Sequence, residues 1–150
     1  MAFLESTTKL NIISPINQLG YGLVGLNIVK SLLSNSHDVA LFGLGQIQAD
    51  PKLHDFLKGC FEASRMPDFN APCIRIWHQH DMSEWVGSGT KIGFPIFELN
   101  KFTPQEIHHL KHPDKLFVCS KWAKEILLDQ LGDDIKEENI HVIPLGVDRS

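Results

Sequence analysis

Side chains suited to chemistry gather directly after an apolar run. The stretch "WHQHD" (77–81) places His78, His80 and Asp81 at the end of "CIRIWH". Imidazoles and carboxylates exchange protons and hydrogen bonds near neutral pH, so these groups could assist or hold a substrate hydroxyl. The same residue types in His-x-His spacing also suit a metal ion, although no further ligand is evident. A third interpretation leaves the histidines in a loop without a chemical role.

A second candidate is the glycine pattern "GYGLVG" (20–25), which has the G-x-G-x-x-G spacing of dinucleotide-binding turns. In that fingerprint the first glycine follows its strand at once, and an acid at the end of the second strand binds the ribose. Here the first predicted strand ends near Ser14, and no acid follows the second one before Asp50. An NAD-binding oxidoreductase domain therefore stays only as an alternative.

Gly20 and Gly22 have a different prospect, because they precede a predicted helix. Glycines at a helix start let backbone N–H groups approach an anion, and the helix dipole favours negative charge. We expect a phosphate or diphosphate there; the alternative is a flexible turn without a ligand. Gly25 lies one turn further on, and we expect it to permit close packing of the helix.

These candidates need elements that position them. Apolar runs predict strands at 9–14, 37–43, 73–78, 91–98, 115–120 and 139–144. Helices are predicted from after the glycine loop (15–22) to about 34, from the Asp50-Pro51 cap to about 61, from the Thr103–Glu106 capping box onward, and over 121–131 between Ser120 and Gly132. Strands that are apolar throughout and alternate with helices predict one Rossmann-like domain over 1–150, α/β and doubly wound, with a mostly parallel sheet. Ligands of such sheets bind outside the carboxyl ends of the strands.

Composition limits the class of protein. The chain has 150 residues, 43% of them hydrophobic, and a net charge of −4, which argues against a nucleic-acid partner. Three well-separated cysteines argue against a disulfide framework. The start lacks the pattern of a signal peptide, and no apolar run approaches the roughly 20 residues that span a bilayer. We expect a cytoplasmic protein without a transmembrane segment.

The stretch "DKLFVCSKWAKEILLDQLGDDIKEENIHVIPLGVD" (114–148) resembles a segment of GT-B-fold glycosyltransferases, in particular the large family four of retaining nucleotide-sugar transferases. That segment has a strand ending in Ser, a helix, a strand, and then Pro-x-Gly-Val-Asp, which here is Pro144, Gly146, Val147 and Asp148. Upstream, "KIGFPIFELNKF" (91–102) resembles a subset in which the strand ends in an aromatic residue followed by Glu.

The resemblance implies an enzyme with two Rossmann-like domains facing each other, of which this chain is the N-terminal, acceptor-side half. The reaction would move a sugar from a nucleotide-diphosphate sugar to a hydroxyl acceptor (a glycan, a lipid or a small molecule) with retention, and without a metal or other cofactor. The C-terminal donor domain, or a dimer partner, would complete the cleft, so we expect the 150 residues alone to be inactive. The alternative is a stand-alone glycan-binding or self-pairing half domain.

The resemblance also implies roles for individual residues. Glu98 stands where many members of the family have a histidine close to the donor sugar; a carboxylate there can accept hydrogen bonds from sugar hydroxyls or stabilise a cationic sugar. Its alternative is a pair with Lys101, and Ser120 has the alternative of only capping a helix. Together with the histidine stretch taken from residue type and spacing, we expect a site with Glu98, His80 and Asp81 as catalytic residues, Gly20 and Gly22 against the donor diphosphate, and His78, Asn17 and Ser120 on the acceptor side of the cleft.

Overall fold

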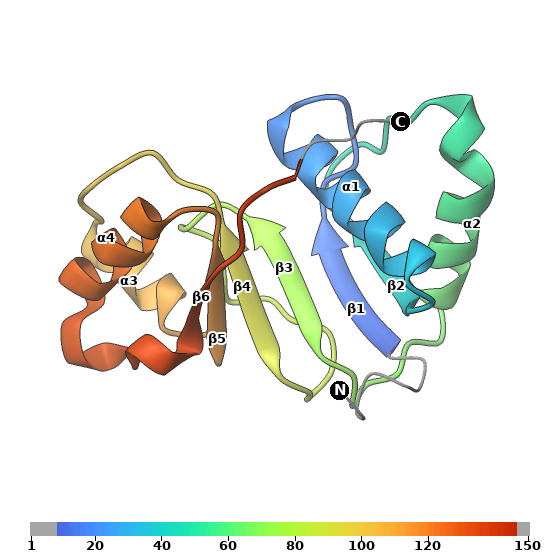
Figure 1. Ribbon diagram of the computed structural model, residues 1–150. Coiled ribbons are helices and arrows are strands. Elements are labelled where there is room, and N and C mark those ends of the chain that lie inside the picture. Colours follow the sequence, from blue (N-terminus) through green and yellow to red (C-terminus); the bar gives the residue numbers. More distant parts are fainter. Residues whose placement is uncertain (1–8, 147–150) are drawn as a thin grey trace.

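The computed structural model describes residues 9–146, which form a single six-stranded sheet with helices on both faces (Figure 1). The strands are β1 (Lys9–Ser14), β2 (Asp38–Gly43), β3 (Cys73–Trp77), β4 (Lys91–Pro95), β5 (Lys115–Val118) and β6 (Ile140–Val142). The helices are α1 (Gly20–Ser34), α2 (His54–Ala63), α3 (Pro104–Leu110) and α4 (Lys121–Leu131), with 3-10 turns at Pro51–Leu53, Gly132–Asp134 and Glu137–Asn139. Within the described residues all strand pairs are parallel, in the order β2-β1-β3-β4-β5-β6.

The two faces of the sheet carry separate apolar clusters. Ile12, Ile74 and Ile76 pack with Leu26 and Val29 of α1 on one face. Leu116, Val118 and Ile140 pack with Ala123 and Leu127 of α4 in the second cluster. Neighbouring residues of a strand point to opposite faces, and Phe117 of β5 indeed belongs to the first cluster. Helices therefore cover both faces, and the predicted doubly wound α/β fold is confirmed.

The ends of several elements differ from those predicted. α1 begins at Gly20, so the glycines that were placed in the preceding loop form the first turn of the helix. β4 ends at Pro95, which has no N–H to continue the ladder, and Glu98 lies three residues beyond the strand rather than at its end. β5 ends at Val118, so Ser120 also follows its strand at a distance. The capping box of Thr103 and Glu106 at the start of α3 is confirmed.

The described residues hold no helix with the length and the apolar content to cross a membrane. Cys60, Cys73 and Cys119 are free thiols. Val147 and Asp148, half of the Pro-x-Gly-Val-Asp motif, lie outside the described residues.

Candidate functional site

The order in which successive strands are added to the sheet reverses between β1 and β3. β1 connects to β2 on one side, while β3 connects to β4 on the other. Crossovers leave such a pair of strands in opposite directions, and the crevice between them is where doubly wound sheets bind ligands. At this edge the start of α1 stands beside the ends of the strands (Figure 1). The predicted glycine and histidine sites both fall here.

The loop between β1 and α1 is shaped by Asn17. Its Oδ1 accepts a hydrogen bond from the backbone N–H of Leu19 at 2.8 Å, which bends the chain into the helix. A Cβ on Gly22 would stand 2.2 Å from that same Oδ1 and 2.4 Å from the Asn17 nitrogen. Position 22 therefore needs a residue without a Cβ, because Asn17 lies too close for any other, and Gly22 is buried. Gly22, expected against the diphosphate, and Asn17, expected on the acceptor side, therefore lie in contact with each other.

Gly20 and Gly25 have opposite surroundings. No atom lies within 4 Å of a Cβ placed on Gly20, so the start of α1 is open to a ligand. A Cβ on Gly25 would stand 1.9 Å from the Oγ of the buried Ser14 and 2.9 Å from the carbonyl oxygen of Pro15. The packing role expected for Gly25 is confirmed, and it holds α1 tightly against the end of β1.

Tyr21 connects the glycine turn to the neighbouring strands. Its hydroxyl donates a hydrogen bond to the carbonyl oxygen of Ile96, just beyond β4. Its ring meets His78 edge-on at 4.6 Å between centroids and lies 5.6 Å from the ring of Trp77. Burial raises the pKa of the Tyr21 phenol to about 12, against the lowering effect of the bond to Ile96, and the nearby Cys119 and Glu98 raise it further. Tyr21 thus stays a neutral donor at physiological pH.

His78 and His80 stand together, as the sequence suggested. Their rings are stacked at 5.1 Å between centroids, with 13° between planes. His78 is half-buried and His80 is exposed. Burial and then the neighbouring His80 lower the pKa of His78, partly offset by Asp81. A neutral imidazole at this edge can accept a proton or a hydrogen bond from a substrate hydroxyl.

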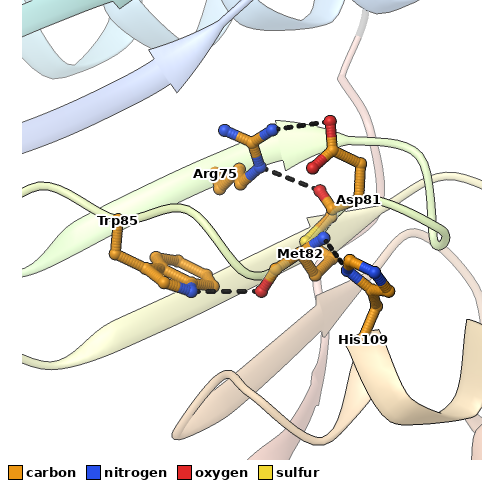
Figure 2. A network of polar contacts seen from close by, with 5 residues as sticks. All are labelled: Arg75, Asp81, Met82, Trp85 and His109. Carbon is orange, nitrogen blue, oxygen red and sulfur yellow. Dashed lines mark hydrogen bonds and ion pairs between the residues drawn. The ribbon is translucent and has the colours of Figure 1, made fainter.

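Asp81 faces into the protein toward a buried arginine of β3 (Figure 2). The Nη2 of Arg75 lies 3.0 Å from the Asp81 Oδ2, and its Nε donates to the Asp81 carbonyl oxygen at 2.8 Å. Only 2% of the Arg75 side chain is exposed, against 38% for Asp81. A guanidinium buried to this degree needs a partner charge, so Asp81 anchors the turn that carries the histidines.

The turn also contacts α3. The Nε2 of Gln79 donates to Oε2 of Glu106 at 2.6 Å. The backbone N–H of Met82 donates to Nδ1 of His109 at 3.1 Å (Figure 2). Burial alone would raise the pKa of Glu106, but hydrogen bonds from Thr103 and Gln79, with the nearby His80, outweigh it and lower the pKa below its ordinary value. Glu106 is therefore ionised at neutral pH.

Glu98 and Ser120 occupy the neighbouring strand ends. Glu98 is exposed, and in the described part of the chain it forms no ion pair with Lys101. It lies close enough to Tyr21 to affect the pKa of the phenol. The Oγ of Ser120 accepts from the backbone N–H of Ala123 at 3.1 Å, so its helix-capping role is present. Glu98 thus borders the same edge as His78, while the Ser120 hydroxyl is already engaged by α4.

The spacing of His78 and His80 also suited a metal ion. Over residues 9–146, no group of three or more His, Cys, Asp or Glu side chains could hold an ion. The ring centroids of His108 in α3 and His112 just after it lie 5.0 Å apart, with the rings edge to face. Burial and the two neighbouring histidines lower the pKa of His112.

Sequence reasoning missed Tyr21, Arg75 and the contacts made by α3. A signal existed for two of these. Arg75 is the charged residue inside the apolar strand "CIRIW", which demands an acidic partner, and Asp81 is the first acid after it. Tyr21 is the single tyrosine of the chain and stands inside the glycine pattern.

Comparison with known proteins identifies no family. No protein-family model matches the chain, and neither a curated protein nor a solved structure matches it. The functional argument therefore depends on the site itself.

Proposed function

We propose that this chain is the acceptor-side domain of a GT-B-type glycosyltransferase, an enzyme that moves a sugar from a nucleotide-diphosphate sugar to a hydroxyl acceptor with retention. One observation carries the proposal. The open helix start at Gly20 is joined through the ring of Tyr21 to the imidazole of His78, 4.6 Å away, at the switch point of the sheet. An anion-binding group and a hydrogen-bond acceptor for a hydroxyl thus lie side by side, as transfer from a diphosphate requires.

Each residue has a chemical task in this proposal. The backbone N–H groups at Gly20 stabilise the charge that develops on the diphosphate as the glycosidic bond breaks. His78, held neutral, accepts a hydrogen bond from the acceptor hydroxyl, and the exposed His80 beside it extends that surface. The carboxylate of Glu98 accepts hydrogen bonds from sugar hydroxyls or stabilises a cationic sugar.

The remaining predicted residues shape these groups. Asn17 fixes the entry to α1, and Ser120 caps α4 at the border of the acceptor side. Asp81 holds the histidine-bearing turn through Arg75. We propose that a donor-binding domain or a partner chain supplies the second wall, that no metal takes part, and that the protein works in the cytoplasm, which the three free thiols support.

A ³¹P NMR titration with inorganic pyrophosphate and with UDP, GDP and ADP tests the anion site. We expect weak binding that G20A reduces about tenfold, because the added methyl group hinders close approach of the anion to the backbone N–H groups. G59A is the matched control, because a Cβ on Gly59 of α2 also meets no atom within 4 Å. Absence of binding, or equal losses in both variants, contradicts the proposal. Robust sugar transfer by the 150 residues alone contradicts the division of the cleft between two domains.

The self-pairing alternative is favoured by an apolar groove of about 750 Å³ between α1 and the segment after β6. Leu23, Ile143 and Leu145 in its lining are 39%, 37% and 43% exposed. If the chain functions as a paired half domain, sedimentation equilibrium shows a dimer that L23E disrupts. A monomer at all concentrations removes this alternative.

The nicotinamide alternative requires an acid at the end of β2. β2 ends at Gly43, and the side chain of Asp50 accepts from the backbone N–H of Lys52 to cap a 3-10 turn. Titration with NAD and NADP tests this alternative, and saturable binding would revive it.

A further inference from the structure

Four residues that carry the candidate histidines form a tight turn, here called the histidine turn (His78–Asp81). The backbone N–H of Asp81 donates to the carbonyl oxygen of His78 at 3.2 Å and closes it. The imidazoles of His78 and His80 are stacked, and the first is half-buried while the second is exposed. Partly exposed side chains in a loop have several rotamers available, so stacked rings imply that something holds the turn.

The first attachment is made by Gln79, which lies between the two histidines and is only 9% exposed. Its Nε2 donates to Oε2 of Glu106 at 2.6 Å. Oε1 of Glu106 is occupied separately, because it accepts from the backbone N–H of Thr103 at 2.9 Å in the capping box. Each carboxylate oxygen therefore has its own partner: one serves α3 and the other fixes the histidine turn.

The second attachment follows the turn directly. The backbone N–H of Met82 donates to Nδ1 of His109, so that nitrogen carries no proton (Figure 2). Met82 is fully buried, and its carbonyl oxygen accepts from the indole of Trp85 at 3.1 Å. Arg75 of β3 forms the ion pair with Asp81. The turn is thus tied to β3 through Arg75 and to α3 through two side chains.

We infer that Glu106 and His109 of α3 are positioning residues, which hold Gln79 and Met82 inward and thereby keep His78 and His80 stacked at the edge of the sheet. A capping box alone needs only Glu106 and Thr103. The bond from Gln79 spans 27 residues and adds nothing to the helix cap, so it serves the turn. The catalytic consequence, an aligned acceptor-binding surface, rests on the proposed glycosyl transfer; the positioning itself does not.

Exchanging the two bonded side chains tests the inference. Q79E places a second carboxylate opposite Glu106 and breaks the contact by repulsion. In Q79E/E106Q the amide of residue 106 donates to the carboxylate of residue 79, while its oxygen still accepts from Thr103, because glutamine also completes a capping box. E106Q alone keeps a bond, since the Gln79 amide can reverse its donor and acceptor ends. The matched set separates the loss of the contact from the change of residue 106.

The readout is the nuclear Overhauser effect between the rings of His78 and His80, together with the indole N–H resonance of Trp85. We expect the ring contact in the wild type, in E106Q and in Q79E/E106Q, and its loss in Q79E. A ¹⁵N spectrum of His109 shows Nδ1 unprotonated. In a transfer assay with the donor-binding domain or partner chain supplied, we expect kcat of Q79E to fall about 10²-fold with KM little changed, and the double variant to recover it.

Persistence of the ring contact in a folded Q79E overturns the inference, as does its loss in Q79E/E106Q. If Q79E fails to fold, Q79M removes the donor without adding a charge, and the same two outcomes apply. Loss and recovery of the ring contact in a chain that binds neither pyrophosphate nor a nucleoside diphosphate would uphold the positioning role and count against the proposed function, so the two failures are distinguishable.

Discussion

The ion pair between Arg75 and Asp81 allows a sharp test of what Asp81 does. D81A leaves the guanidinium of Arg75, which is 2% exposed, with the carbonyl oxygen of residue 81 as its remaining partner among residues 9–146. Removing one member of a buried pair costs about 3–5 kcal/mol, because the other charge stays buried and uncompensated. The Asp81 side chain is 38% exposed, so solvent already screens part of the attraction.

We therefore expect D81A to lower the free energy of unfolding by about 2–3 kcal/mol. In a chain of this size that corresponds to a fall of about 4–12 °C in Tm. D81N keeps an oxygen that accepts from Arg75 but loses the charge, and we expect about half the effect. R75M/D81A removes both charges, and stability should return toward the wild-type value, because apolar replacements of buried pairs are often neutral.

Urea unfolding of the four proteins, followed by tryptophan fluorescence, measures these differences at a common slope. The same variants separate a structural role of Asp81 from a catalytic one. A residue that only anchors the turn loses stability in D81A and regains it in the double variant. Unchanged stability in D81A, together with loss of ligand binding or transfer in D81N, would refute the anchoring argument and assign Asp81 to the chemistry.

Two further predictions concern α1. G25A should lower the free energy of unfolding by about 1–3 kcal/mol, because the new Cβ would stand 1.9 Å from the Oγ of Ser14. G59A, whose Cβ meets open space, should raise the free energy of unfolding by up to about 1 kcal/mol. Equal urea midpoints for the two variants would disprove the packing account. Tyr21 is the single tyrosine, so tyrosinate absorbance reports it alone, and its midpoint should lie at pH about 12, above the ordinary value of about 10. Because the unfolded phenol loses its proton first, stability should be full below pH 10 and fall between pH 10 and 12 in the wild type but not in Y21F; a midpoint near 10 contradicts burial of the phenol.

The order and type of the elements could be predicted because apolar runs and helix caps are local signals. The six strands and four helices lie where the sequence places them, and the caps at Thr103 and Ser120 are present. The errors occur at ends, where a local pattern competes with the packing of the sheet. Pro95 ends β4 three residues before Glu98, and α1 takes in the glycines because Gly22 can lie against Asn17.

The site was predictable only in part, for a related reason. The histidines and the open glycine could be found because each stands at a strand or helix end. The residues that fix their geometry could not, since Glu106 lies 27 residues from Gln79 and reaches it only through the tertiary fold. Arg75 is the exception, because a charged residue inside an apolar strand predicts a partner of opposite charge nearby.

Tyr21 contacts both sides of the proposed site. Its backbone belongs to the first turn of α1, next to the open Gly20, while its hydroxyl reaches Ile96 and its ring touches His78. We expect an anion that tightens the first turn of α1 also to restrain the imidazole of His78, which we propose to face the acceptor. The histidine turn is held separately by β3 through Arg75 and by α3 through Glu106. A chain that bound a diphosphate at Gly20 without altering the ring resonances of His78 would show that the two sides act independently.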